Sequence, residues 1–223
     1  MKIERRLCLQ DLPLFDNVEP DVFSKVCGQA ASRRNLQRGD TLFNQGDTID
    51  TLYLIKAGSF KLARVNEEGK EIILQVAAKG EVLGETALFR SGTHPATAIA
   101  LEDARVCALN RLSLEEIIRE SPDLALQVIS SLANRLYSTW EQFTELRTGS
   151  IRDKVLNLFI RLAVEHGESS SEGTLIKIRL TQQDIADFIG ASRVMVVQVL
   201  KELADQNYIN KVDKYYLLKD RCF

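Results

Sequence analysis

The sequence predicts an α+β protein in which a barrel of short strands comes first, a long helix second and a small helical domain third. Glycines recur at short intervals between Gly39 and Gly92, which is typical of many short antiparallel strands separated by turns. After Asn110 the apolar spacing changes from two residues to three or four, which indicates helices. We therefore expect three parts, covering residues 1–120, 121–149 and 150–223.

The composition is that of an ordinary globular protein that can bury a core. The chain has 223 residues, of which 45% are hydrophobic and 27% charged. No apolar run approaches the roughly 18 residues that a membrane span needs, and the N-terminus does not look like a secretion signal. The four cysteines are scattered, which disfavours a disulfide framework and a zinc site. We expect a cytoplasmic protein with no membrane partner and no bound metal.

The first part contains five runs that alternate or are wholly apolar, as short strands do. They cover residues 51–55, 60–65, 71–76, 96–100 and 105–109. Residues 66–70, which include Gly69, have the composition of a hairpin turn. Closing such strands into a barrel or jelly roll removes exposed sheet edges, so we expect that architecture.

One long helix follows, with Ser121 as its expected N-cap and Pro122 at the first helical position. Gly149 is its expected C-cap, and Ser150 caps the next helix. The segment of about 26 residues would be roughly 39 Å long. Its apolar positions exceed what one small barrel can cover, so a second copy of the chain is the expected partner, through Ile129, Leu132, Leu136, Trp140 and Phe143. The alternative is a helix that packs on its own barrel.

The last part contains helices over residues 151–165, 181–189 and 193–206, followed by a β-hairpin within 208–217. Ala186, Gly190 and Val196 have the spacing of a helix-turn-helix, which needs a small residue, a turn glycine and a buried branched residue. Ile185, Ile189, Val199, Leu200 and Leu203 would complete the core. Helix pairs of this kind are common, but the hairpin adds a basic wing and favours nucleic-acid binding.

Particular segments then resemble the Crp/Fnr family of bacterial transcription regulators. They are YLIKAG at 53–58, GEVLGE at 80–85, LTQQDIA at 180–186, SR at 192–193 and LKEL at 200–203. The resemblance implies a cyclic-nucleotide-binding-like β jelly roll, a long dimerisation helix and a C-terminal winged helix-turn-helix. It also implies a homodimer that binds a palindromic promoter site, acts on RNA polymerase as an activator or as a repressor, and responds to a small molecule or a redox or gas signal.

The helix that begins at Arg193 is the expected DNA reader. Arg193, Val194, Val197 and Gln198 lie opposite the apolar face of that helix and would point into the major groove. Arginine can pair with guanine, glutamine with adenine, and valine can contact a thymine methyl group. Thr181 and Ser192 are better interpreted as N-caps, and Ser192 could also reach a phosphate. The full set of expected DNA contacts is Thr181, Gln182, Ser192, Arg193, Val194, Val197, Gln198, Lys201 and Lys214; the alternative for each is a solvated surface residue.

The expected effector pocket lies between the barrel and the long helix. Members that bind cyclic AMP have a Gly-Glu pair, then an arginine and a Ser or Thr that hold the phosphate, and hydroxyl residues on the long helix. Here Pro95 and Ala96 stand at the phosphate-binding positions, which removes the charged fork and disfavours cyclic AMP. The pocket would comprise Gly84, Glu85, Thr86, Pro95, Ala96, Thr139 and Trp140, with Glu85 alternatively a structural turn residue.

Other signals remain open. Residues 91–107 resemble the oxygen-sensing Fnr branch, in which the cysteine at the position of Cys107 is one of four iron–sulfur ligands. Only Cys8 stands near the N-terminus, so an iron–sulfur cluster is disfavoured. Cys8 and Cys107 are instead a candidate redox pair, against the alternative of two ordinary thiols. His94 could ligate a haem, against the alternative of an ordinary hydrogen-bonding histidine.

Two competing functions come from other classes. An enzyme on a cupin-like barrel would need several histidines and carboxylates converging on its interior, but His94 and His166 are the only histidines. No nucleophile elbow or P-loop is present either, so we do not expect an enzyme. An effector-binding module without DNA contact is disfavoured by the helix-turn-helix pattern.

Overall fold

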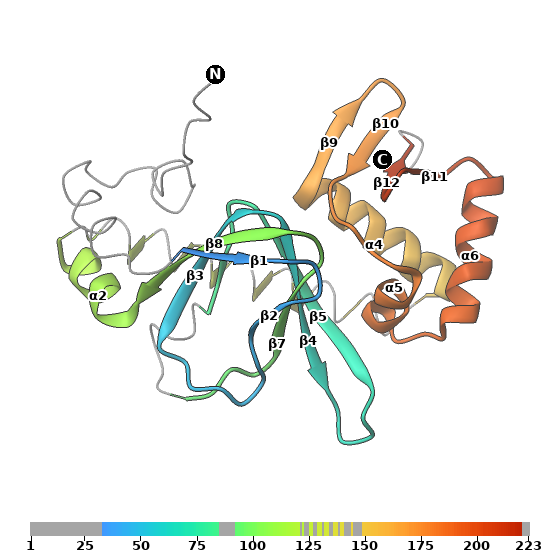
Figure 1. Ribbon diagram of the computed structural model, residues 1–223. Helices are drawn as coiled ribbons and strands as arrows, with labels where there is room; N and C mark the ends of the chain where they lie inside the picture. The colour runs from blue at the N-terminus through green and yellow to red at the C-terminus, as the bar shows by residue number, and fades with distance from the viewer. Residues whose placement is uncertain are drawn as a thin grey trace. The chain divides into compact units, whose positions relative to one another are not determined.

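The computed structural model describes residues 33–84, 92–120 and 149–219, together with part of the segment 122–144. The chain divides into two compact units, residues 1–62 with 76–137 and residues 63–75 with 138–223. The labelled strands and helices of both units are drawn in Figure 1. Among the described helices, none has the length and apolar character needed to cross a bilayer.

The N-terminal strands form two four-stranded sheets, as expected for a jelly roll. One sheet has the order β1-β8-β3-β6 and the other β2-β7-β4-β5. The bounds are β1 Arg33–Leu36, β2 Thr41–Phe43, β3 Thr51–Ala57, β4 Ser59–Val65, β5 Glu71–Ala78, β6 Val82–Leu83, β7 Thr97–Ala100 and β8 Ala104–Asn110, followed by helix α2 Arg111–Glu120. The five predicted runs coincide with β3, β4, β5, β7 and β8, and the described part of the chain adds β1, β2 and β6.

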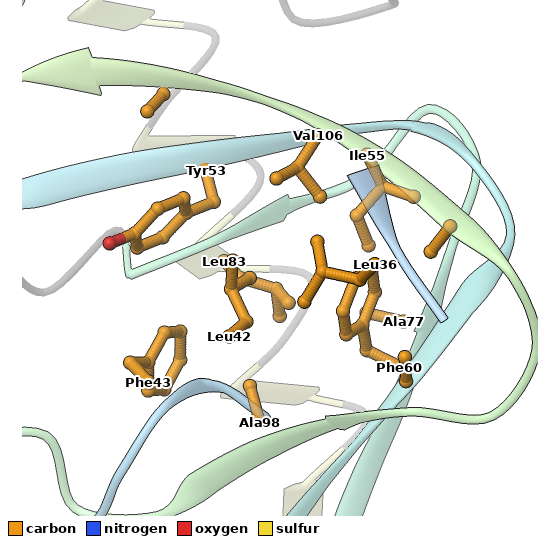
Figure 2. Close-up of a cluster of buried hydrophobic side chains, with 13 residues drawn as sticks. Leu36, Leu42, Phe43, Tyr53, Ile55, Phe60, Ala77, Leu83, Ala98 and Val106 are labelled. Carbon is orange, nitrogen blue, oxygen red and sulfur yellow. The ribbon is translucent and has the colours of Figure 1, made fainter. Parts of the chain in front are cut away.

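The inward-facing side chains of both sheets make one core, shown in Figure 2. Small residues alternate with large ones, because alanines on β5, β7 and β8 leave room for aromatic rings between the sheets. Phe60 and Ile55 are completely buried at its centre. The cluster comprises Leu36, Leu42, Phe43, Tyr53, Ile55, Phe60, Ala77, Leu83, Ala98, Ala100, Ala104, Val106 and Ala108.

The predicted turn between β4 and β5 is present. The backbone N–H of Asn66 donates to the carbonyl of Lys70 at 3.0 Å, and the Asn66 side chain accepts from the Lys70 N–H at 2.9 Å. Gly84, which follows β6, has φ +80°, and a Cβ there would lie 2.6 Å from the carbonyl oxygen of Thr51. Both the backbone conformation and the close approach of strand β3 therefore require glycine at this position.

The described residues between 122 and 144 are all helical, and they include Pro122, as predicted. Within this segment the Thr144 hydroxyl donates to the carbonyl of Trp140 at 3.0 Å, a bond to the preceding turn. Ser150 caps the next helix, α4 (Ile151–His166), through a capping box with Asp153. The hydrogen bonds from Ser150 hold the pKa of Asp153 below its ordinary value, because they stabilise the carboxylate.

The C-terminal part packs three helices against a four-stranded sheet of order β11-β12-β10-β9. After α4 come β9 Gly167–Ser170, β10 Gly173–Ile176, α5 Gln182–Ile189, α6 Arg193–Asp205, β11 Ile209–Val212 and β12 Tyr215–Leu218. The rings of Phe159 on α4 and Tyr216 on β12 lie 4.9 Å apart, which joins helix and sheet in one core. Burial raises the pKa of the Tyr216 phenol.

The predicted helices and the terminal hairpin are confirmed here, with two differences. The hairpin of β9 and β10 was not predicted, since the sequence GESS of β9 has no apolar alternation and most of it is exposed. Val199 is only half-buried, whereas Ile185, Ile189, Leu200 and Leu203 are buried as expected.

Candidate nucleic-acid interface

Helix α5 begins at a complete capping box. The Asp184 N–H donates to the Thr181 hydroxyl oxygen at 3.1 Å, and the Thr181 N–H donates to the Asp184 carboxylate at 2.9 Å. These two bonds satisfy backbone donors that the first helical turn would otherwise leave unpaired. Thr181 therefore has the N-cap role that the sequence predicts, and its position fixes where α5 starts.

The turn between α5 and α6 has the geometry of a helix-turn-helix. Gly190 ends α5 in the left-handed region with φ +69° and ψ +31°, and its N–H donates to the carbonyl of Ala186. Ser192 then caps α6, with its hydroxyl accepting from the Met195 N–H at 3.3 Å. Ala186 and Val196 are both fully buried where the two helices pack. These are the three roles that the spacing of alanine, glycine and valine predicts.

One face of α6 is solvent-exposed over its whole first half. Val196, Leu200 and Leu203 are buried against the rest of the domain, while Arg193, Val194, Val197, Gln198 and Lys201 are exposed. Met195 is also exposed, at 46%, so the first half of α6 presents one guanidinium, one ammonium, one amide and three apolar side chains. These are the groups that recognise guanine edges, phosphates, adenine edges and thymine methyl groups.

The structure brings Gln182, at the start of α5, next to Arg193, at the start of α6. Arg193 Nη2 donates to Gln182 Oε1 at 3.4 Å, and both side chains lie beside the turn. This long contact restrains one edge of the guanidinium and involves only one of its five N–H groups. Both residues are DNA contacts predicted from the sequence, but their contact with each other follows from the fold and not from their spacing.

The wing is the hairpin of β11 and β12, and it is basic at its tip. Lys214 Nζ lies 5.1 Å from the centroid of the Tyr215 ring, and Lys177 Nζ lies 5.4 Å from the same ring. Both ammonium groups thus make cation–π contacts with the same ring. Lys177, which follows β10, is not among the residues predicted from the sequence, because it is distant along the chain from Tyr215. The alternation of apolar and polar residues over 173–180 was a usable signal for a strand there. Lys177 also pairs with Glu168 at 3.2 Å.

The residues expected to form an effector pocket are only partly described. Gly84 and Ala96 are buried in the barrel unit, and Pro95 is exposed. Thr139 and Trp140, both exposed, belong to the other unit. Glu85 and Thr86 lie outside the described residues. The pocket therefore stays a prediction.

The candidate redox and haem residues have ordinary structural surroundings where they are described. The His94 ring stacks on Phe43, with centroids 3.7 Å apart and planes inclined by 11°. The backbone N–H of His94 donates to the carbonyl of Asp47 at 2.8 Å. Cys107 is a half-buried free thiol on β8, paired in register with Arg33 and Leu54. Cys8 and Phe143 lie outside the described residues. Among the described residues, no group of three or more His, Cys, Asp or Glu side chains could hold a metal ion.

Comparison with known proteins agrees with this architecture. Residues 33–121 match the cyclic nucleotide-binding domain family, and residues 153–222 match the Crp-like helix-turn-helix domain family. The cAMP-activated global transcriptional regulator CRP of Salmonella typhimurium is 30% identical over 171 residues, which cover 76% of this chain and 81% of that protein. The CRP-like cAMP-activated global transcriptional regulator of Mycobacterium tuberculosis is 28% identical over 207 residues, 93% of this chain and 92% of that protein.

Solved structures show the same fold. FixK2 from Bradyrhizobium japonicum aligns with a TM-score of 0.75 at 17% identity, over 86% of this chain and 93% of that one. The c-di-GMP-responsive regulator CLP of Xanthomonas campestris aligns with a TM-score of 0.73 at 22% identity, over 90% and 99% respectively.

The fold, the exposed first half of α6 and the matched domains define a class of protein: a DNA-binding regulator whose first domain is of the cyclic-nucleotide-binding type. The chain belongs to the Crp/Fnr family of transcription regulators. Its curated relatives are regulators rather than enzymes.

Proposed function

We propose that this regulator acts in the cytoplasm as a homodimer that binds a palindromic promoter site and acts on RNA polymerase. The proposal is supported by one observation above all, the apolar stripe on the long helix. Leu126, Ile129, Leu136, Tyr137 and Trp140 are each between 50% and 62% exposed in the single chain. On a helix that advances about 100° per residue, these positions fall within one arc of roughly 100°.

A stripe of this width is what a paired helix presents to its partner. Five large apolar side chains left in water would be a solubility liability, and burying each is worth about 1.5–3 kcal/mol. A second copy of the chain offers the same stripe, and a two-fold axis between copies would present two α6 helices to two half-sites. The palindromic site follows from that symmetry.

The dimer is tested by replacing Leu136 with aspartate. We expect Leu136→Asp to halve the mass measured by light scattering, because it places a charge in the apolar stripe. Val164→Asp is the matched control, since Val164 is 73% exposed on α4 and outside the stripe. An unchanged dimer mass for Leu136→Asp, with the Val164→Asp control also dimeric, would contradict the proposed interface.

We further propose that the controlling signal is not cyclic AMP. Pro95 offers no hydrogen-bond donor and Ala96 is buried, so neither can replace an arginine and a hydroxyl that hold a phosphate. A small-molecule, redox or gas signal, with a haem or the Cys8–Cys107 pair among the candidates, would instead act between the barrel and the long helix near Glu85, Thr139 and Trp140. Only a signal with different affinities for two states of the dimer can shift them.

Calorimetry and fluorescence test this proposal together. We expect no binding of cyclic AMP at micromolar concentration, and no change in emission from Trp140, the single tryptophan of the chain. Native mass spectrometry of anaerobically purified protein then shows whether a haem, a cluster or a metabolite is retained. Micromolar cyclic AMP binding that changes Trp140 emission would contradict the proposal.

A further inference from the structure

The outermost side chain in the first turn of α6, that of Val194, cannot form a hydrogen bond. Val194 is 78% exposed, more than any other large hydrophobic side chain among the described residues. The buried positions Val196, Leu200 and Leu203 define the inner side of α6. At about 100° per residue, Val194 falls almost directly opposite the middle of that inner side, so it has the greatest outward reach of the first turn.

Neither stability nor packing explains a valine there. Valine is a weaker helix former than alanine, because its branched side chain loses rotamer freedom against the preceding turn. Its exposure shows that it contributes little to the core. Val197, on the same face, is also exposed at 39%. A single exposed valine needs no explanation, but two on the side that carries Arg193 and Gln198 point to a partner with an apolar feature.

The major groove has one such feature, the C5 methyl group of thymine. We propose that Val194 reads the C5 methyl group of a thymine in each half-site of the DNA. The inference rests on the proposed function, since it assumes that α6 enters the major groove. It adds the chemical identity of one recognised group, next to the guanine expected opposite Arg193.

Val194 also discriminates against other bases at the same position. A cytosine amino group pressed against its side chain would lose water without gaining a hydrogen bond, which is costly. Recognition thus combines a gain with thymine and a penalty with cytosine. The Gln182–Arg193 contact holds the neighbouring guanidinium, so that the two readers act at adjacent positions of one half-site.

The test removes only the methyl group. A palindromic site is first selected from a randomised duplex library with the full-length chain. The selection is done at low salt, where electrostatic contacts with the DNA phosphates strengthen binding. Each thymine of the half-site is then replaced by uracil, which pairs identically but has no methyl group. We expect one position at which uracil weakens binding about fourfold in one half-site and about fifteenfold in both.

Two variants assign that effect to Val194. In Val194→Ala the uracil penalty at this position should fall, because the shorter side chain loses contact with the methyl group, while penalties at other positions keep their size. Val164→Ala, which shortens an equally exposed valine on α4, should keep the penalty at its wild-type size. Both residues are exposed, so neither variant is expected to disturb folding.

The outcomes separate this inference from the proposed function. If the library yields no enriched sequence, the proposed site-specific DNA binding is wrong, and this inference falls with it. If a site is enriched but uracil has no effect at any position, or if every penalty survives in Val194→Ala, only the assignment of Val194 is wrong.

Discussion

At the scale of single residues, contacts within the domain orient the proposed reading face of α6, which consists of Arg193, Val194, Val197, Gln198 and Lys201. Arg193 is held at one edge by Gln182, and the helix N-terminus beneath it is fixed by the Ser192 cap. A guanidinium that already has a restricted orientation loses less conformational entropy when it pairs with guanine. Gln182 is therefore a positioning residue for Arg193, in addition to any contact of its own with DNA.

This positioning role predicts that substitutions of Arg193 and Gln182 lower base selectivity by different amounts. Arg193→Ala should cost about 1–3 kcal/mol at one guanine of each half-site and little elsewhere. Gln182→Ala should lower selectivity at the same guanine by a smaller amount, because the guanidinium remains but is less restrained. Competition binding with single-base variants of the selected palindrome measures both effects.

Lys201 supplies the matched control, since it is exposed on the same helix but carries a point charge. Lys201→Ala should weaken all sequences alike and reduce the salt dependence of binding by about one counterion. If Arg193→Ala behaves in that uniform way, Arg193 contacts phosphate and does not read a base.

At the scale of elements, the sequence predicts those whose pattern is strong and local. Strands β3, β4, β5, β7 and β8 show alternation or apolar runs, and α5 and α6 have caps that can be read from Thr181, Gly190 and Ser192. Strand β1 has the sequence RRNL, with one apolar residue, and strands β2 and β6 have only three and two residues, too few for a period to appear.

Strand β9 forms because it pairs with β10, and not because its own sequence favours a strand. Its GESS sequence has no apolar face, and it is ordered by the register of Glu168 with Leu175 on β10. An ion pair strengthens the turn region, since Lys219 Nζ lies 2.7 Å from the Glu172 carboxylate and holds the pKa of that carboxyl below its usual range. Contacts between residues 47 positions apart in the chain leave no local signal that a sequence pattern could show.

The candidate interface shows the same limit. The exposed positions of α6 follow from helical period alone, so Arg193, Val194, Val197 and Gln198 could be predicted. The contact of Arg193 with Gln182 depends on the left-handed turn at Gly190, and that of Lys177 with Tyr215 on the pairing of β10 with β12. Neither arrangement follows from spacing.

At the scale of the whole molecule, the chain consists of two compact units, for which we propose different tasks. The barrel unit has an apolar core and matches the cyclic nucleotide-binding domain family. The second unit presents the exposed helix α6 and the hairpin of β11 and β12, which carries Lys214. In the proposed mechanism, dimerisation gives two reading helices a fixed spacing, and a signal in the barrel changes that spacing. The expected half-site separation is about 34 Å, one turn of DNA.

The central claim is that two copies of this chain bind one palindrome, and the mass of the protein–DNA complex tests it most directly. Native mass spectrometry of the full-length chain with the selected duplex should give two chains of 25.1 kDa per duplex. The fraction of duplex that carries two chains should fall strongly when one half-site is scrambled. The second copy of α6 then loses its base contacts. A complex of one chain per duplex, or two chains bound equally well to the scrambled duplex, would contradict the account.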